Sequence, residues 1–145
     1  MSLLRLPRTP ESRKLASLRI SIALIFIAAG LSKLLIPIIV SAFEAQLKET
    51  GLPLYVRSSF SLLFPILEIV IGYFLLIGKH TRFWSVIAMG VSCFGAYVHL
   101  HIDNPALFPF QPSAPIIPFT LMGLSAVLFV MGAGMWSKDL DIFEK

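Results

Sequence analysis

Four long stretches of mainly apolar residues constrain this chain more than any other feature of its sequence. They run over residues 18–36, 60–77, 83–100 and 117–135. A helix needs about 20 such residues to cross the hydrocarbon core of a bilayer, which is about 30 Å thick. Each stretch is apolar on all sides, which is typical of a membrane span and not of a helix in a soluble bundle. The sequence therefore predicts an all-α fold, a bundle of four transmembrane helices.

The composition supports a single membrane domain over residues 1–145. Hydrophobic residues make up 57% of the chain and charged residues 14%, whereas a soluble domain has about 45–50% and about 25%. This is too little polar surface for a water-soluble globule and too much apolar surface for a disordered chain. The bilayer is thus the expected partner, and no nucleic-acid partner is predicted. The single cysteine, Cys93, excludes an internal disulfide and a CxxC redox or zinc site.

The basic residues predict the topology of the chain. Most of them precede the first span or lie in the 78–82 turn and the tail: Arg5, Arg8, Arg13, Lys14, Arg19, Lys79, Arg82, Lys138 and Lys145. A longer loop is predicted over residues 37–59, which include Glu44 and Lys48, on the opposite side. The segments on that side carry only Lys48 and Arg57 as basic residues. Because cytoplasmic loops are enriched in Lys and Arg, both termini are expected in the cytoplasm. A cleaved signal peptide is disfavoured, since the first apolar stretch is too long and is interrupted by Lys33.

Three ionisable side chains fall inside the predicted spans: Lys33, Glu68 and His99. At a rise of about 1.5 Å per residue, Lys33 lies about 9 Å and His99 about 10 Å outward of the span centres. Glu68 lies near the centre of its own span. A lone charge there costs about 2.5–3.5 kcal/mol on insertion scales, and pairing Lys33 with Glu68 would cancel much of this cost. We expect a polar pocket of these three residues, able to pass protons or to hydrogen-bond a quinone-like carbonyl.

Structural alternatives to this pocket stay open. Lys33 lies near a span end, where a lysine can extend to the headgroups, and His99 and His101 can be interfacial histidines. His99, His101 and Asp103 resemble a metal hook, but helical residues at i and i+2 point to nearly opposite faces, so no metal is predicted. The proline-rich stretch 101–116 cannot continue a helix. It is expected to fold onto the end of the bundle, with His101 and Asp103 as secondary site candidates.

A series of short motifs follows the spans in order. They are Arg19, Gly30-x-x-Lys33, Gly51-Leu-Pro53, Glu68-x-x-x-Gly72, Leu76-x-Gly78-x-x-x-Arg82 and His99. In order and spacing they resemble the DoxX family of small membrane proteins, over about residues 15–140. The resemblance implies a four-helix protein of the bacterial inner membrane, associated with respiratory or redox systems such as quinol or thiosulfate oxidation.

These features predict an accessory or quinone-associated subunit of a redox membrane complex. The chain carries no flavin, nucleotide or cluster motif and no catalytic set, so it is at most a subunit of an oxidoreductase. No intrinsic cofactor is predicted, and a quinone is the ligand that the polar pocket would suit. Other membrane subunits or further copies of the chain are the expected protein partners. Two alternatives stay open, a purely structural subunit and a small proton-coupled transporter.

Overall fold

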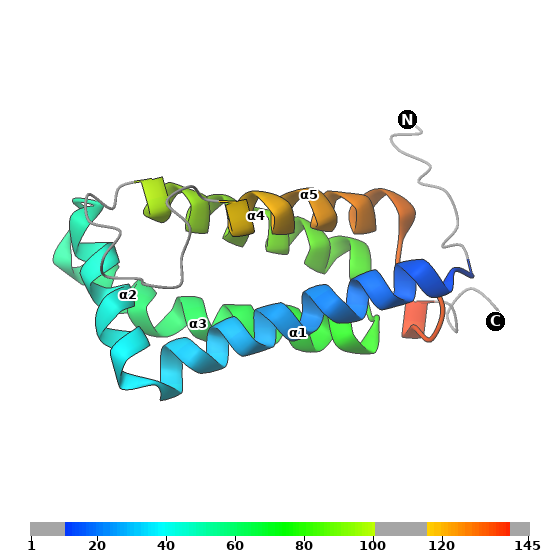
Figure 1. The fold of residues 1–145 in the computed structure, drawn as a ribbon, viewed down its shortest axis with the longest axis horizontal. Coiled ribbons are helices and arrows are strands. Elements are labelled where there is room, and N and C mark those ends of the chain that lie inside the picture. Colours follow the sequence, from blue (N-terminus) through cyan, green and yellow to red (C-terminus); the bar gives the residue numbers. More distant parts are fainter. Residues whose placement is uncertain (1–10, 101–115, 140–145) are drawn as a thin grey trace.

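The computed structural model describes residues 11–100 and 116–139. All regular structure in this part of the chain is helical (Figure 1), in five helices: α1 (Arg13–Leu35), α2 (Pro37–Glu49), α3 (Leu54–Ile77), α4 (Thr81–Leu100) and α5 (Ile116–Met131). Three of them, α1, α3 and α4, are long and apolar enough to cross a membrane, while α5 is a shorter apolar helix. The all-α prediction is therefore confirmed, together with three of the four predicted spans.

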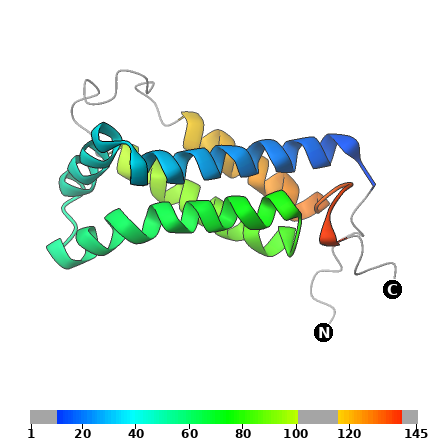
Figure 2. The ribbon, with the colours of Figure 1, turned by 90° about the horizontal axis from the view of Figure 1, so that it is seen from below.

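The long helices form two layers. Helix α1 lies against α3, and α4 lies against α5, as Figures 1 and 2 both show. Helix α2 runs across the end of the bundle that is farthest from the start of α1. Residues that follow α5 return to the opposite end, where they contact α1 and the turn between α3 and α4.

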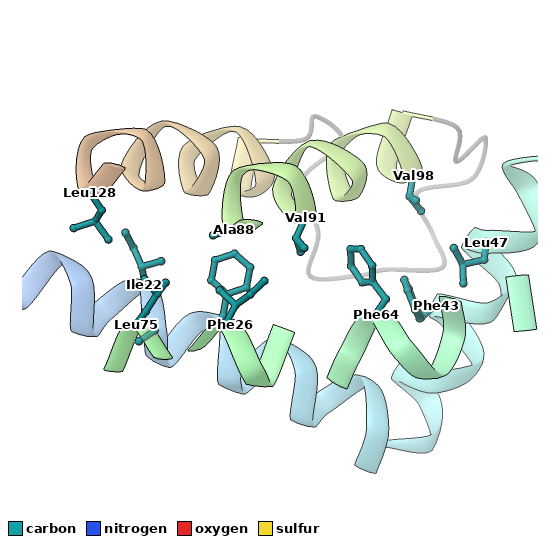
Figure 3. Close-up of a cluster of buried hydrophobic side chains, with 12 residues drawn as sticks. Ile22, Phe26, Phe43, Leu47, Phe64, Leu75, Ala88, Val91, Val98 and Leu128 are labelled. Atoms are coloured by element: carbon teal, nitrogen blue, oxygen red, sulfur yellow. The ribbon is translucent and has the colours of Figure 1, made fainter. Parts of the chain in front are cut away.

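Buried apolar side chains fill the space between the two layers (Figure 3). Ile22 and Phe26 from α1 face Ala88 and Val91 from α4 in this core. Near α2 the core continues through a second group of side chains, formed by Phe43, Leu47, Phe64 and Val98. Large apolar side chains elsewhere point outward, as expected where a helix surface is in contact with lipid.

The segment between the first two spans is not the loop that the sequence predicted. It holds α2, and α3 begins at Leu54 instead of residue 60. Ile36 has an extended backbone that ends α1, and Pro37 begins α2, where its missing N–H breaks no helical hydrogen bond. Phe43 and Leu47 are the buried side of this short helix. The charged residues on its other side made the segment look like a polar loop.

The fourth predicted span is shorter than expected. Helix α5 ends at Met131, and not at residue 135, because Gly132 and Gly134 have positive φ angles of 89° and 72°. At about 1.5 Å per residue this helix is roughly 24 Å long, less than the hydrocarbon core of about 30 Å. The exact four-span bundle and the orientation of the termini therefore stay predictions.

Candidate functional site

The polar group inside the bundle is an ion pair between α1 and α3. Lys33, near the end of α1, donates from Nζ to both carboxylate oxygens of Glu68, at 2.5 and 2.7 Å. The Glu68 side chain is only 7% exposed and that of Lys33 is 21% exposed. The ammonium thus turns inward to the acid instead of extending to the headgroups. Each charge removes much of the cost of placing the other in an apolar medium.

Two glycines allow the helices that carry the pair to approach closely. A Cβ atom on Gly30 would lie 2.5 Å from the Pro65 carbonyl oxygen and 3.2 Å from Cβ of Glu68. A Cβ atom on Gly72 would lie 2.7 Å from the carbonyl oxygen of Ala23. Small residues at helix contacts let backbones approach in membranes, and here they bring α1 within reach of the Glu68 carboxylate.

Two aromatic rings complete the surroundings of the lysine head group. Its Nζ lies 5.4 Å from the ring centroid of Phe43 on α2 and 5.7 Å from that of Phe64 on α3. The two rings are 6.0 Å apart, and Figure 3 shows them side by side where the two helices meet. A cation within about 6 Å of an aromatic face is attracted by the ring quadrupole. We call Glu68, Phe43 and Phe64 the ammonium box.

The structure brings together two of the three predicted pocket residues. His99 lies half-buried in the last turn of α4, and among the described residues no hydrogen bond or ion pair joins it to Lys33 or Glu68. His101 and Asp103 lie outside the described residues. The pairing of Lys33 with Glu68 follows the expected geometry, while the proton or quinone role of the pocket stays a prediction.

A second buried cation, Arg19, was not predicted as such. It was counted with the basic residues that predict the cytoplasmic side, at the start of the first span, and its side chain is fully buried. Its guanidinium donates to five backbone carbonyls, which we call the Arg19 cage: Ala133 at 2.9 Å, Leu75 at 2.5 Å, Leu76 at 2.7 Å, Met135 at 3.3 Å and Trp136 at 3.0 Å. The last carbonyls of a helix have no partner within it. Those of α3 and of the segment after α5 converge on this one side chain.

The turn between α3 and α4 is part of the same assembly. Gly78 ends α3 with a positive φ of 65°, and a Cβ atom there would lie 2.8 Å from Nη1 of Arg19. The carboxylate of Asp139 accepts hydrogen bonds from the backbone N–H of His80 at 2.7 Å and of Thr81 at 2.8 Å. Asp139 therefore caps the start of α4 from a distant part of the sequence.

A separate open groove lies between α2 and the first turns of α3. It is lined by Glu44, Leu47, Lys48, Leu54, Arg57, Ser58 and Ser61. Neither Lys33 nor Glu68 lines it, so a ligand held in this groove would not be in contact with the ion pair.

Residues 12–106 match the family described as methylamine utilisation protein MauE. This match includes α1 to α4, and with them Arg19 and Lys33. No curated protein and no solved structure matches the chain. The DoxX resemblance is therefore wrong. Three of the four glycines that suggested it are explained by packing, because Gly30, Gly72 and Gly78 each lie where a Cβ atom would meet a neighbouring segment, whereas a Cβ atom on Gly51 would meet nothing within 4 Å. Such positions recur in membrane bundles of any family.

Proposed function

Because the chain belongs to the family of methylamine utilisation protein MauE, we propose that it is a membrane-embedded accessory protein of methylamine utilisation. The observation that carries this proposal is the family match, which takes in all of α1 to α4. The three long apolar helices give such a protein its contact with the bilayer. Its partners are other membrane proteins of the same system, or further copies of the chain.

The proposed topology places both termini in the cytoplasm of a bacterial cell. The start of α1, the turn after α3 and the residues after α5 lie at one end of the molecule. That end carries Arg13, Lys14, Lys79 and Lys138, whereas the groove end carries Lys48 and Arg57. The cytoplasmic sides of membrane proteins are enriched in such residues, which supports this orientation.

The part of the protein that we propose to be active is the Lys33–Glu68 pair. Intramembrane ionisable residues commonly mark proton relays or ligand sites. In a redox system this pair would hold a proton close to a quinone-like carbonyl, and any electron carrier would belong to a partner protein. The burial of the carboxylate supports a role of this kind.

The test is a deletion strain of the host, grown on methylamine and, as a reference, on a carbon and nitrogen source that does not need methylamine oxidation. We expect the deletion to abolish growth on methylamine only and the intact gene to restore it. Equal growth of the deletion strain on both media would refute the proposal.

A second complementation separates an active pair from a structural one. The double variant Lys33→Met/Glu68→Gln carries no charge at either position of the pair and should still reach the membrane. If the pair is active, this variant fails to restore growth at a normal protein level. Full restoration would leave the protein a purely structural subunit.

A further inference from the structure

The ammonium box has the composition of a binding site for a primary ammonium ion. Glu68 supplies two acceptor oxygens at 2.5 and 2.7 Å from the nitrogen. Phe43 and Phe64 supply ring faces at 5.4 and 5.7 Å. A carboxylate and aromatic faces are the groups with which proteins recognise organic ammonium ligands. The nitrogen that occupies the box belongs to the chain itself, on Lys33.

The contacts of the box are all made with the ammonium group of Lys33 and not with the rest of its side chain. The carboxylate oxygens of the box contact Nζ, and the distances to both rings are measured from the same atom. Any unbranched primary alkylammonium ion presents this head group. The walls are in place without rearrangement, since Phe43, Phe64 and Glu68 are all buried in the core, and a preorganised site binds its ligand at a lower entropic cost.

We infer that Glu68, Phe43 and Phe64 form a binding site for small primary alkylammonium ions, with Lys33 as its tethered occupant. A free amine reaches Glu68 only when the lysine head group is out of the box. Lys33 is the more exposed partner of the pair, at 21% against 7%, so the open side of the site lies along its side chain. This inference rests on the geometry of the box and goes beyond the proposed accessory role.

The test uses the purified full-length protein and the variant Lys33→Ala. This substitution removes three carbons and the nitrogen, which are the heavy atoms of n-propylammonium. We expect n-propylammonium to raise the unfolding midpoint of the variant by roughly 5–10 °C at an excess of about 100-fold over its dissociation constant. Methylammonium should act in the same direction but at higher concentration. Propanol, which lacks the charge, should have no effect.

Three further proteins serve as controls. The wild type should not respond to the amine, because its box is occupied, and Lys33→Ala/Glu68→Gln should not respond because the carboxylate is gone. Lys79→Ala, which removes an exposed lysine at the other end of the molecule, should behave as the wild type. No response of Lys33→Ala to either amine, or an equal response of the double variant, would overturn the inference.

If Lys33→Ala does not fold without a ligand, a second experiment decides the question. The protein is then extracted from membranes with n-propylammonium or with propanol present throughout. Recovery of folded protein only with the amine supports the site. Aggregation in both, while the uncharged Lys33→Met/Glu68→Gln is recovered in both, would refute it. The growth test of the proposed function is independent, since it measures methylamine utilisation in cells and not binding to the purified chain.

Discussion

Helix α1 carries two cations that turn into the protein, the buried Arg19 and the partly buried Lys33, and their surroundings differ. At one end, Arg19 donates to five backbone carbonyls of the Arg19 cage. At the other end, Lys33 donates to one carboxylate between two aromatic rings. Through the cage, Arg19 joins α1 to the end of α3 and to the segment after α5. The guanidinium stays charged at any ordinary pH. The ammonium box depends on one titratable side chain, so its charge state can change.

The residue types fit these two environments. Arginine has five N–H donors in a rigid planar fork, whereas lysine is a compact charge at the end of a flexible stem. A fork can reach carbonyls of the α3 end and of the segment after α5 at the same time. A single ammonium suits the small space between Glu68 and the two rings. The end with the cage therefore acts as a fixed closure, and the end with the box is the one for which we propose a chemical role.

The largest expected effect is the loss of the cage in Arg19→Lys. A lysine has one nitrogen and cannot serve five carbonyls spread over two segments, so several buried carbonyls lose their partner. Each such group costs about 1–3 kcal/mol, and we expect the free energy of unfolding to fall by roughly 4 kcal/mol or more. The unfolding midpoint of the purified protein measures this. Arg13→Lys, at an exposed position of the same helix, is the control and should match the wild type.

An unfolding midpoint of Arg19→Lys close to that of the wild type would mean that the cage does not join the segments. The contrast between a closed end and an end with a proposed chemical role would then be lost.

The next effect is the loss of one partner of the ion pair. Glu68→Gln leaves the Lys33 ammonium without a counter-charge, and removal of one partner of a buried pair costs about 3–5 kcal/mol. The double variant Lys33→Met/Glu68→Gln should recover part of this loss, because neither position then carries an unpaired charge. The free energies of unfolding of Lys33→Met, Glu68→Gln and the double variant together give the coupling energy of the pair. Additive losses would show that the two side chains act independently.

These two cations also show what the sequence can predict. The pairing of Lys33 with Glu68 was predictable, since both are ionisable, both fall inside spans and a rise of about 1.5 Å per residue puts them within reach. The Arg19 cage was not, because every residue has a carbonyl and only the fold decides which ones converge. His99 lies in the last turn of α4, but its place along the helix does not fix the side on which its side chain lies.

The same reasoning explains the errors in the helices and in the family. Glu44 and Lys48 suggested a polar loop, and the buried side of α2 became visible only with Phe43 and Leu47 in place. Spaced glycines and charges suggested DoxX, although such spacing follows from close helix packing in any membrane bundle. The cost of burying charge predicted one contact, that of Lys33 with Glu68, whereas the spacing of small residues did not identify the family.

A smaller effect is expected for Gly30→Ala, which tests how the box is positioned. The added Cβ would lie 2.5 Å from the Pro65 carbonyl oxygen and would push α1 away from α3. Overpacking of this kind costs about 1–3 kcal/mol, and it should lower the unfolding midpoint. Gly90→Ala is the matched control, because a Cβ atom there meets nothing within 4 Å. It should leave the midpoint unchanged or raise it slightly, since alanine favours a helix.

The smallest effect concerns the cap beside the cage. Asp139→Ala removes the acceptors for the N–H groups of His80 and Thr81, and loss of a helix cap costs about 1 kcal/mol. We expect a slightly lower unfolding midpoint and faster hydrogen exchange at the start of α4, with no change near the ammonium box. Lys138→Ala, at the exposed neighbouring position, should alter neither. Faster exchange that reached the residues around Glu68 would show that the two ends are coupled, and the closure would then influence the chemistry at the other end.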